Sequence, residues 1–387
     1  MSRRRFISTS EDYYEPPTDD TLEGDIDNHF RLLSLLDSPA TIHTNQPPAP
    51  PLSELARILT ANSIVSTSSS FSAQQNKARG KAASNNPVRK IGAGACGAVF
   101  SQDGHPLAYK VGKTGASDDD ALWTDFSMHQ RIIEALKNSD CDIEIPECHF
   151  FVGHADSEWW DAHPSLVAAA APVCNLPARV LVSERILPLP APVRSALINS
   201  FCKDTLRDAA AADPSNKDCL VRVYLGSTSG RTTSFFSLRN FKLHLNQMIE
   251  MGLDCEALAV SMGTTLGLIH WKAKTDARDI EFALGSSATR ISGNDNFERR
   301  QTRLFVLDFN QVRDITMDDA GVELAVQAFS INDPYYPRPH GCTRVEKELW
   351  NSFVRSYLDS SNKVLDEEYR ILPRKFLAGL IKKYKPA

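Results

Sequence analysis

Residues 92–99 read Gly92-Ala93-Gly94-Ala95-Cys96-Gly97-Ala98-Val99, a glycine-rich turn between two short apolar stretches. Residues 88–91 and 98–100, on either side of the turn, are predicted to be strands. The G-x-G-x-x-G pattern therefore lies between two strands, which disfavours a dinucleotide-binding fold, where a helix follows the glycines. Glycines let backbone amides approach a phosphate without a side-chain clash. The turn predicts a phosphate-covering hairpin; glycines that serve only the tight turn are the alternative.

A third apolar run, residues 107–111, follows the hairpin signal Asp103-Gly104 and carries Lys110. Apolar residues at helical spacing predict a helix over residues 120–136. We expect a carboxylate of this helix to hold Lys110, with Asp125 the best-placed acid and Glu134 the competitor. Because aspartate is shorter than glutamate, the pair needs a close helix or a bridging water. A solvated edge-strand lysine is the alternative.

The rest of the chain is predicted to be mostly helical after the prolines at 188 and 190. Residues 150–152 and 179–182 read as further strands, residues 238–251 and 258–271 as the clearest helices, and residues 304–307 as a buried strand. The predicted fold class is α+β, a small antiparallel-sheet lobe followed by a larger helical lobe. The expected divisions are a disordered low-complexity tail at 1–86, the strand-rich lobe at 87–186, the helical lobe at 187–342 and C-terminal helices at 343–387.

The predicted tail has the composition of a disordered segment. Seven acids and no base lie between Asp12 and Asp27, and proline-rich and serine-rich runs follow at 47–51 and 66–70. Two apolar patches, residues 30–36 and 52–59, interrupt it. For the first, a helix that docks on a partner or on the folded domain and a transient helix without a partner both stay open.

Two further motifs carry acids next to predicted buried strands. Asp276 is followed five residues later by Glu281, at the start of the apolar run Phe282-Ala283-Leu284. Asp308 follows the buried strand 304–307, in Asp308-Phe309-Asn310. Carboxylate oxygens are ligands that Mg²⁺ prefers. A capped polar loop, for which Asp and Glu are routine, is the alternative for the first motif.

These four motifs, in this order, resemble those of protein kinases. The resemblance implies a two-lobed fold that binds ATP and Mg²⁺ and transfers a phosphoryl group to an acceptor. It also implies the role of each residue. Gly92, Gly94 and Gly97 cover the phosphates, Lys110 steadied by Asp125 holds them, Glu281 and Asp308 hold Mg²⁺, Asp276 orients or deprotonates the acceptor hydroxyl, and the backbone of Glu184 and Ile186 reads adenine. For residues 184–186, a plain interdomain linker is the alternative.

Residues 88–358 also resemble an uncharacterised fungal kinase-like family often labelled "zinc finger protein". The resemblance rests on Leu238-Arg239-Asn240-Phe241, Ile269-His270-Trp271-Lys272-Ala273, the motifs at Asp276 and Asp308, and Asn332-Asp333-Pro334-Tyr335-Tyr336-Pro337-Arg338-Pro339. It implies a setting beside fungal secondary-metabolite genes. The cysteines do not have zinc-finger spacing: Cys141, Cys148 and His149 form the one close group.

Departures from the kinase pattern decide how much activity to expect. Lys274-Thr275-Asp276 stands where kinases have H-R-D, and no A-P-E motif follows Asp308. Little chain separates Asp308 from Asn332, so we expect a small-molecule acceptor rather than a peptide. The alternative is a catalytically inactive pseudokinase scaffold that binds a protein partner. The expected partners are therefore a nucleotide and an acceptor, which is either a small molecule or a protein.

Composition limits the remaining classes. Lys and Arg total 43 against 48 Asp and Glu, a net charge of −5, which argues against nucleic acid as a partner and against a zinc-dependent DNA-binding regulator. No apolar stretch approaches the roughly 20 residues of a transmembrane helix. The start of the chain has no apolar core of a signal peptide. We expect an intracellular, most simply cytoplasmic, protein whose cysteines are thiols.

Overall fold

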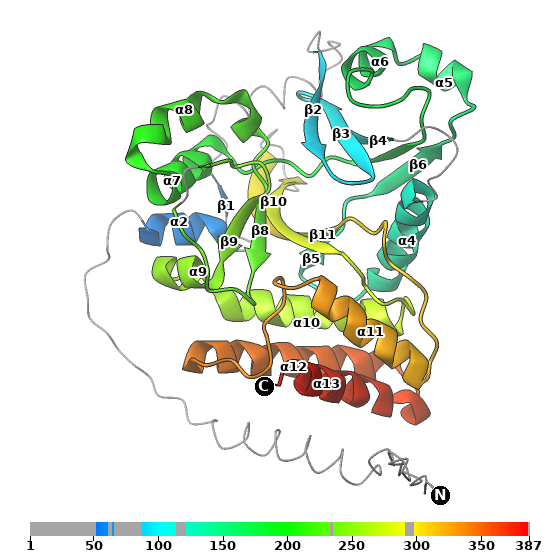
Figure 1. Cartoon of the computed structure of the whole chain (residues 1–387), viewed down its shortest axis with the longest axis vertical. Coiled ribbons are helices and arrows are strands. Elements are labelled where there is room, and N and C mark those ends of the chain that lie inside the picture. The colour runs from blue at the N-terminus through cyan, green and yellow to red at the C-terminus, as the bar shows by residue number, and fades with distance from the viewer. Residues whose placement is uncertain are drawn as a thin grey trace, which may run out of the picture. The chain divides into compact units, whose positions relative to one another are not determined.

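The computed structural model describes residues 52–60, 64–65, 87–113, 121–232, 235–290 and 298–385. These residues form two β-sheets and a set of helices, so the fold class is α+β (Figure 1). The acidic and proline-rich stretches of the expected tail and the apolar patch at 30–36 lie outside the described residues. Within the described part of the chain, no helix is both long and apolar enough to cross a membrane.

The first sheet has five antiparallel strands in the order β2-β3-β4-β7-β6. The glycine-rich turn joins β2 to β3, and the Asp103-Gly104 turn joins β3 to β4, as predicted. Phe100, Val111 and Val180 are fully buried in the core beneath this sheet. The elements of this region are β2 (Val88–Ala93), β3 (Gly97–Gln102), β4 (Leu107–Gly112), β6 (Cys148–Val152), α5 (Ser157–Asp161), α6 (Pro164–Ala170) and β7 (Val180–Glu184).

Helix α4 (Ala121–Leu136) contacts β6 and β7 of this sheet. Its buried face carries apolar residues such as Leu122 and Ile132 at helical spacing, together with two polar ones, Asp125 and His129. Burial of a carboxylate is costly unless it is paired. The polar pair on an otherwise apolar face therefore indicates that Asp125 meets a partner from another element.

A second sheet takes most of its strands from the region that we expected to be mostly helical, where we had predicted a strand at 304–307. Its strands run β1-β11-β10-β8-β9, and β5 also pairs with β11. The prediction of a single helix over residues 238–251 is wrong, because β9 precedes α9 there. A four-residue segment with one buried side chain carries little periodicity, so its pairing with β8 decides its structure. The elements are β1 (Ile64–Val65), β5 (Ile143–Glu144), β8 (Val221–Tyr224), β9 (Phe241–His244), α9 (Leu245–Met251), β10 (Glu281–Arg290) and β11 (Glu298–Leu307).

The registers of this sheet bring three distant parts of the chain together. Glu281 pairs with Leu307 in the β10–β11 hairpin, so Asp308 follows immediately beyond the residue opposite Glu281. On the other side of β10, Ala283 pairs with Arg222 of β8. Because residues two apart in a strand share a face, Glu281 lies diagonally across from Arg222.

The helical layer packs around α10 (Cys255–Trp271) and α12 (Arg344–Val364) (Figure 1). These two helices approach closely because α10 has glycines at the contact. A Cβ on Gly267 would lie 2.8 Å from the Tyr357 carbonyl oxygen, and one on Gly263 would lie 2.4 Å from a carbonyl oxygen of α12. The Trp271 indole donates to the Tyr357 hydroxyl at 2.8 Å. The other helices of this region are α7 (Ala191–Phe201), α8 (Arg207–Ala212), α11 (Asp319–Ile331) and α13 (Ile371–Lys383).

Part of the expected disordered tail is packed against the helices. Helix α2 (Leu52–Leu59) contacts α7 and α9, with Leu55 and Leu59 fully buried. Residues 64–65 then pair with β11 at the edge of the second sheet. The expectation of a disordered tail is therefore wrong for these two stretches, because amphipathic leucines bury enough apolar surface to order a short helix against its neighbours.

Candidate functional site

Lys110 is the centre of the candidate site. Its ammonium group lies 2.6 Å from Asp125 Oδ2 and 2.7 Å from Asp308 Oδ1. Burial opposes the charged form of the lysine, but the two carboxylates outweigh that cost and raise the pKa of Lys110. The lysine is therefore a fixed cation that joins the first sheet to α4 and to the end of β11.

Asp125 connects this cation to the segment after β11. Its Oδ1 accepts a hydrogen bond from the Phe309 amide at 3.0 Å, while Oδ2 receives Lys110. Phe309 is fully buried, with its ring 4.9 Å from that of His129 on the same helix. The contact of Asp125 with Lys110 is direct, so a close helix, rather than a bridging water, makes up for the shorter side chain.

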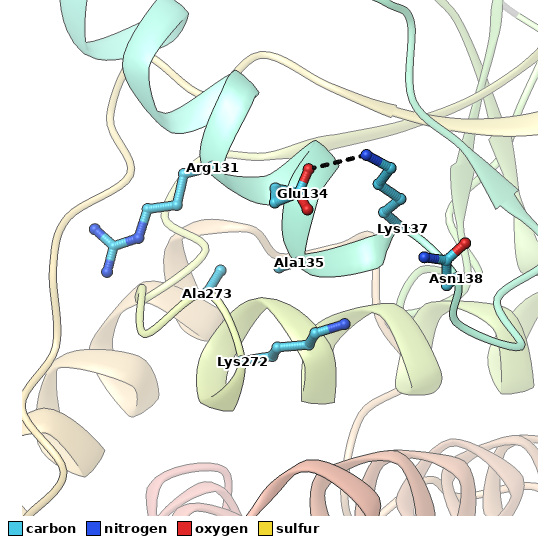
Figure 2. Close-up of a pocket in the computed structure, with 7 residues that line it drawn as sticks. All are labelled: Arg131, Glu134, Ala135, Lys137, Asn138, Lys272 and Ala273. Atoms are coloured by element: carbon cyan, nitrogen blue, oxygen red, sulfur yellow. Dashed lines mark hydrogen bonds and ion pairs between the residues drawn. The ribbon is translucent and has the colours of Figure 1, made fainter.

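Glu134, the competing acid, lies elsewhere. It lines an open cavity of about 620 Å³ together with Arg131, Lys137 and Lys272, and it pairs with Lys137 at 3.5 Å (Figure 2). Its side chain is 74 % exposed. The geometry therefore places Asp125, and not Glu134, next to Lys110.

The three glycines of the β2–β3 turn differ in whether the fold requires a residue without a side chain. A Cβ on Gly97 would lie 2.9 Å from the Val111 carbonyl oxygen, so the pairing with β4 requires this glycine. A Cβ on Gly94 would meet nothing within 4 Å, and one on Gly92 would make only ordinary contacts. Lys113 donates to the Gly94 carbonyl. Gly94 thus leaves open space that protein atoms do not require, which suits close approach of a ligand to the turn.

Glu281 faces a cation from a strand that the motif does not include. Arg222 Nη2 lies 2.6 Å from Glu281 Oε2. Burial raises the pKa of Glu281 to about 7, and the charge of Asp308 adds to that effect while Arg222 opposes it. Glu281 is therefore a half-buried carboxylate that shares its surroundings with Asp308 and is held by Arg222.

Asp279, which the sequence analysis did not single out, lies near these charges, and its Oδ2 accepts a hydrogen bond from the Gln311 side chain. Burial and the charge of Asp308 raise its pKa, and Lys110 and Arg222 act on it in the opposite direction. Its amide donates to Asn332 Oδ1 at 2.5 Å, and its φ of 61° is left-handed. Asp308 also has a left-handed φ, 67°, and such backbone strain clusters at functional sites. The i,i+2 spacing of Asp279 and Glu281 at a strand start is the signal that could have found it.

The carboxylate of Asp276, the expected catalytic residue, is held by hydrogen bonds from two arginine residues. Its Oδ1 accepts from the amides of Arg278 and Arg313 at 3.0 and 2.9 Å, and its Oδ2 accepts from Arg313 Nε at 2.6 Å. Its side chain is fully buried. A carboxylate with three donors and no exposed surface braces the loop that carries it, and the catalytic role of Asp276 stays a prediction.

The expected adenine-reading segment is partly occupied by protein contacts. The Glu184 amide donates to the Glu147 carbonyl at 2.7 Å, and the Arg185 amide donates to the Pro106 carbonyl at 2.7 Å. Ile186 packs against β10, where Gly285 leaves room for its side chain. Of the two residues expected to read adenine, Glu184 therefore has its amide already bonded.

A separate group of four charges, the hinge ionic network, ties this segment to both sheets. Arg89 of β2 pairs with Asp103 at 2.7 Å, and Arg185 pairs with Asp218, just before β8, at 3.2 Å. Arg89 also donates to Asp218 at 2.9 Å. Arg185 and Asp218 are almost fully buried. Two arginines and two aspartates balance, so this network has no net charge.

The acidic side chains near Lys110 are chemically suited to a hard cation, because such cations prefer oxygen ligands. Asp308 and Glu281 carry carboxylate oxygens, the type of ligand that Mg²⁺ prefers beside substrate phosphates and water. In the described ranges, no group of three or more His, Cys, Asp or Glu side chains is arranged to hold a metal ion by itself. Cys141, from the one cysteine–histidine group of the sequence, instead contacts Thr265 Oγ1 at 3.0 Å.

Two comparisons with known proteins find similarity to this chain. A family model described as "Zinc finger protein" matches residues 304–369, the segment that contains Asp308, α11 and all of α12. That segment has one histidine and one cysteine, His340 and Cys342, whereas a structural zinc site takes four ligands. No curated protein matches the chain. A structure titled "Structure of the microcompartment-associated aminopropanol kinase" aligns with 80 % of this chain and 94 % of its own, at 11 % identity and a TM-score of 0.22, too low to equate the folds.

Proposed function

We propose that the chain is a kinase-like phosphotransferase that binds ATP with Mg²⁺ at the Lys110 centre and phosphorylates a hydroxyl of a small molecule. One observation carries the proposal. Lys110 contacts Asp125 and Asp308 together, so a strand lysine, a helix carboxylate and a carboxylate after a buried strand meet at one point. Those are the parts by which kinases position phosphates, and phosphoryl transfer depends mainly on such positioning and on charge.

The proposed phosphate contacts come from the first sheet. Lys110 holds the phosphates, and Asp125 accepts a hydrogen bond from the lysine. Asp125 is itself fixed by a second hydrogen bond, which its other oxygen accepts from the Phe309 amide. The open space at Gly94 supports a phosphate-covering role for the turn, whereas Gly97 serves the sheet itself. Gly92 and the backbone of Ile186 keep their proposed roles in nucleotide binding.

Asp308 and Glu281 would hold Mg²⁺, which, when bound, neutralises phosphate charge. We assign the acceptor-facing carboxylate to Asp279 in place of Asp276. The acceptor oxygen bonds to the γ-phosphorus as the bond to the β,γ-bridging oxygen breaks, and that electron pair leaves with ADP. The acceptor hydroxyl proton passes to the Asp279 carboxylate.

Nucleotide binding is the direct test. Mg·ATP at about 100 times its Kd should stabilise the folded protein by about 2.7 kcal/mol, measured as a raised Tm. Lys110→Met should lose this shift, because the phosphates lose their cation. Lys375→Met is the matched control, since Lys375 pairs with Asp319 at 3.0 Å far from the motifs. A wild-type protein whose Tm does not respond to Mg·ATP contradicts the proposal.

One observation favours a second function, a pseudokinase that binds nucleotide or a protein partner without catalysis. Asp276 is bound by Arg313 and Glu281 by Arg222, so arginines occupy the expected catalytic acid and one of the two expected metal ligands. Consumption of ATP, with water and with a panel of small hydroxyl compounds as acceptors, separates the two functions. Binding without any consumption above background supports the pseudokinase.

A further inference from the structure

Arg222 holds a position that no motif of the sequence indicates. It lies on β8, opposite Ala283 of β10, and reaches diagonally to Glu281 at 2.6 Å. Its side chain is 22 % exposed. A half-buried guanidinium held by one carboxylate at the edge of a group of acids is costly to place unless its remaining donors are used.

The guanidinium has more donors than its neighbours take. Arginine carries five N–H groups in a fixed fork, and Glu281 receives one at Nη2. The Tyr224 hydroxyl lies against the same guanidinium. Beside them, the buried Tyr335 hydroxyl lies against that of Tyr224. The remaining N–H groups of this partly exposed fork suit a ligand with several oxygen atoms.

The two cations of the site approach the acids from different elements. Lys110 comes from β4 and contacts Asp308, while Arg222 comes from β8 and contacts Glu281. Both act electrostatically on Asp279. Cations on two sides of one point can hold an anion between them, and a planar guanidinium suits the geometry of a phosphate.

We propose that Arg222 is a phosphate-binding residue that contacts the terminal phosphate of the nucleotide, with Glu281 orienting its guanidinium. This inference rests on the proposed function, because it assumes that Lys110 holds the other phosphates. Arg222 then distinguishes ATP from ADP, and its loss leaves the binding of the nucleoside unchanged.

Calorimetric titration with ATP, ADP and adenosine, each with Mg²⁺, tests the inference. In Arg222→Gln the ratio of ATP to ADP affinity should fall about tenfold or more, the effect of one charge-assisted hydrogen bond, while adenosine affinity stays constant. Arg303→Gln is the control, since Arg303 forms a similar pair with Glu144 in the same sheet, at 3.0 Å and 24 % exposure. Its ratio should equal that of the wild type.

Arg222→Met also removes the guanidinium, keeps an apolar stem and leaves Glu281, a proposed Mg²⁺ ligand, in place. It decides the case if Arg222→Gln does not fold. A ratio that stays at the wild-type value in the folded variant overturns the inference while leaving nucleotide binding intact. A wild type that binds neither ATP nor ADP overturns the proposed function and this inference together. The two failures are therefore distinguishable.

Discussion

The molecule has two half-buried groups of charges, and they differ in balance. The hinge ionic network of Arg89, Asp103, Arg185 and Asp218 pairs two cations with two anions. The Lys110 centre, with Arg222, sets two cations against four carboxylates, those of Asp125, Asp279, Glu281 and Asp308, so the acids outnumber the cations. A balanced network stabilises contacts within the fold, whereas an unbalanced one is suited to an additional cation or to a change of charge during binding.

Breaking the hinge ionic network should have the largest effect. Asp218→Ala leaves Arg89 and Arg185 without their shared carboxylate, and Arg185 is almost fully buried. We expect a loss of about 3–5 kcal/mol in the free energy of unfolding, measured by urea denaturation. Asp204→Ala is the control, because Asp204 pairs with Arg207 while 86 % exposed, and it should change stability by less than about 0.5 kcal/mol. Equal losses in both variants would refute the structural role of the network.

Asp279→Asn should separate activity from stability at the other group. Removing a proton-accepting carboxylate lowers turnover by about a hundredfold, measured as the rate of ATP consumption. The melting temperature should change little, because Asp279 is only partly buried. Asp276→Asn should show the reverse, a lower melting temperature, because it weakens the bonds that Asp276 makes with Arg313. Wild-type turnover in folded Asp279→Asn contradicts the assignment.

The excess of acids at the Lys110 centre should also make the free energy of unfolding depend on pH, through Glu281. This effect should be smaller than the two above. The pKa of Glu281 is about 7 in the folded protein, against an ordinary value of 4.5. The folded state thus holds a proton that the unfolded state releases, and this stabilisation is complete below pH 4.5 and lost as pH rises through 7. Relative to Glu281→Gln, the wild type should lose about 2 kcal/mol between pH 5 and pH 8, without Mg²⁺.

Urea denaturation at the two pH values measures this difference. Glu348→Gln serves as the control, because Glu348 pairs with Arg344 on an exposed face of α12. The control should track the wild type at both pH values. A wild type whose stability, relative to Glu281→Gln, does not fall with rising pH shows that Glu281 is ionised throughout.

Local patterns predicted much of the first sheet and part of the site. The glycine-rich turn, the run that carries Lys110 and the helix that carries Asp125 are short, contiguous signals, and the structure has a hairpin, β4 and α4 at those positions. The choice of Asp125 over Glu134 also followed from helical spacing. In the second sheet, the strand at 304–307 was predicted, whereas short strands such as β9 were missed because four residues show little periodicity of their own.

The sequence by itself determined the α+β class, the order of the motifs and which acids stand beside buried strands, because these depend on spacing along a few neighbouring residues. Only the tertiary structure decided that Arg313 forms an ion pair with Asp276 and that Arg222 forms one with Glu281. The second pairing joins residues 59 apart, through the register between β8 and β10. Contacts of that kind depend on how separate strands pair, which local spacing does not encode.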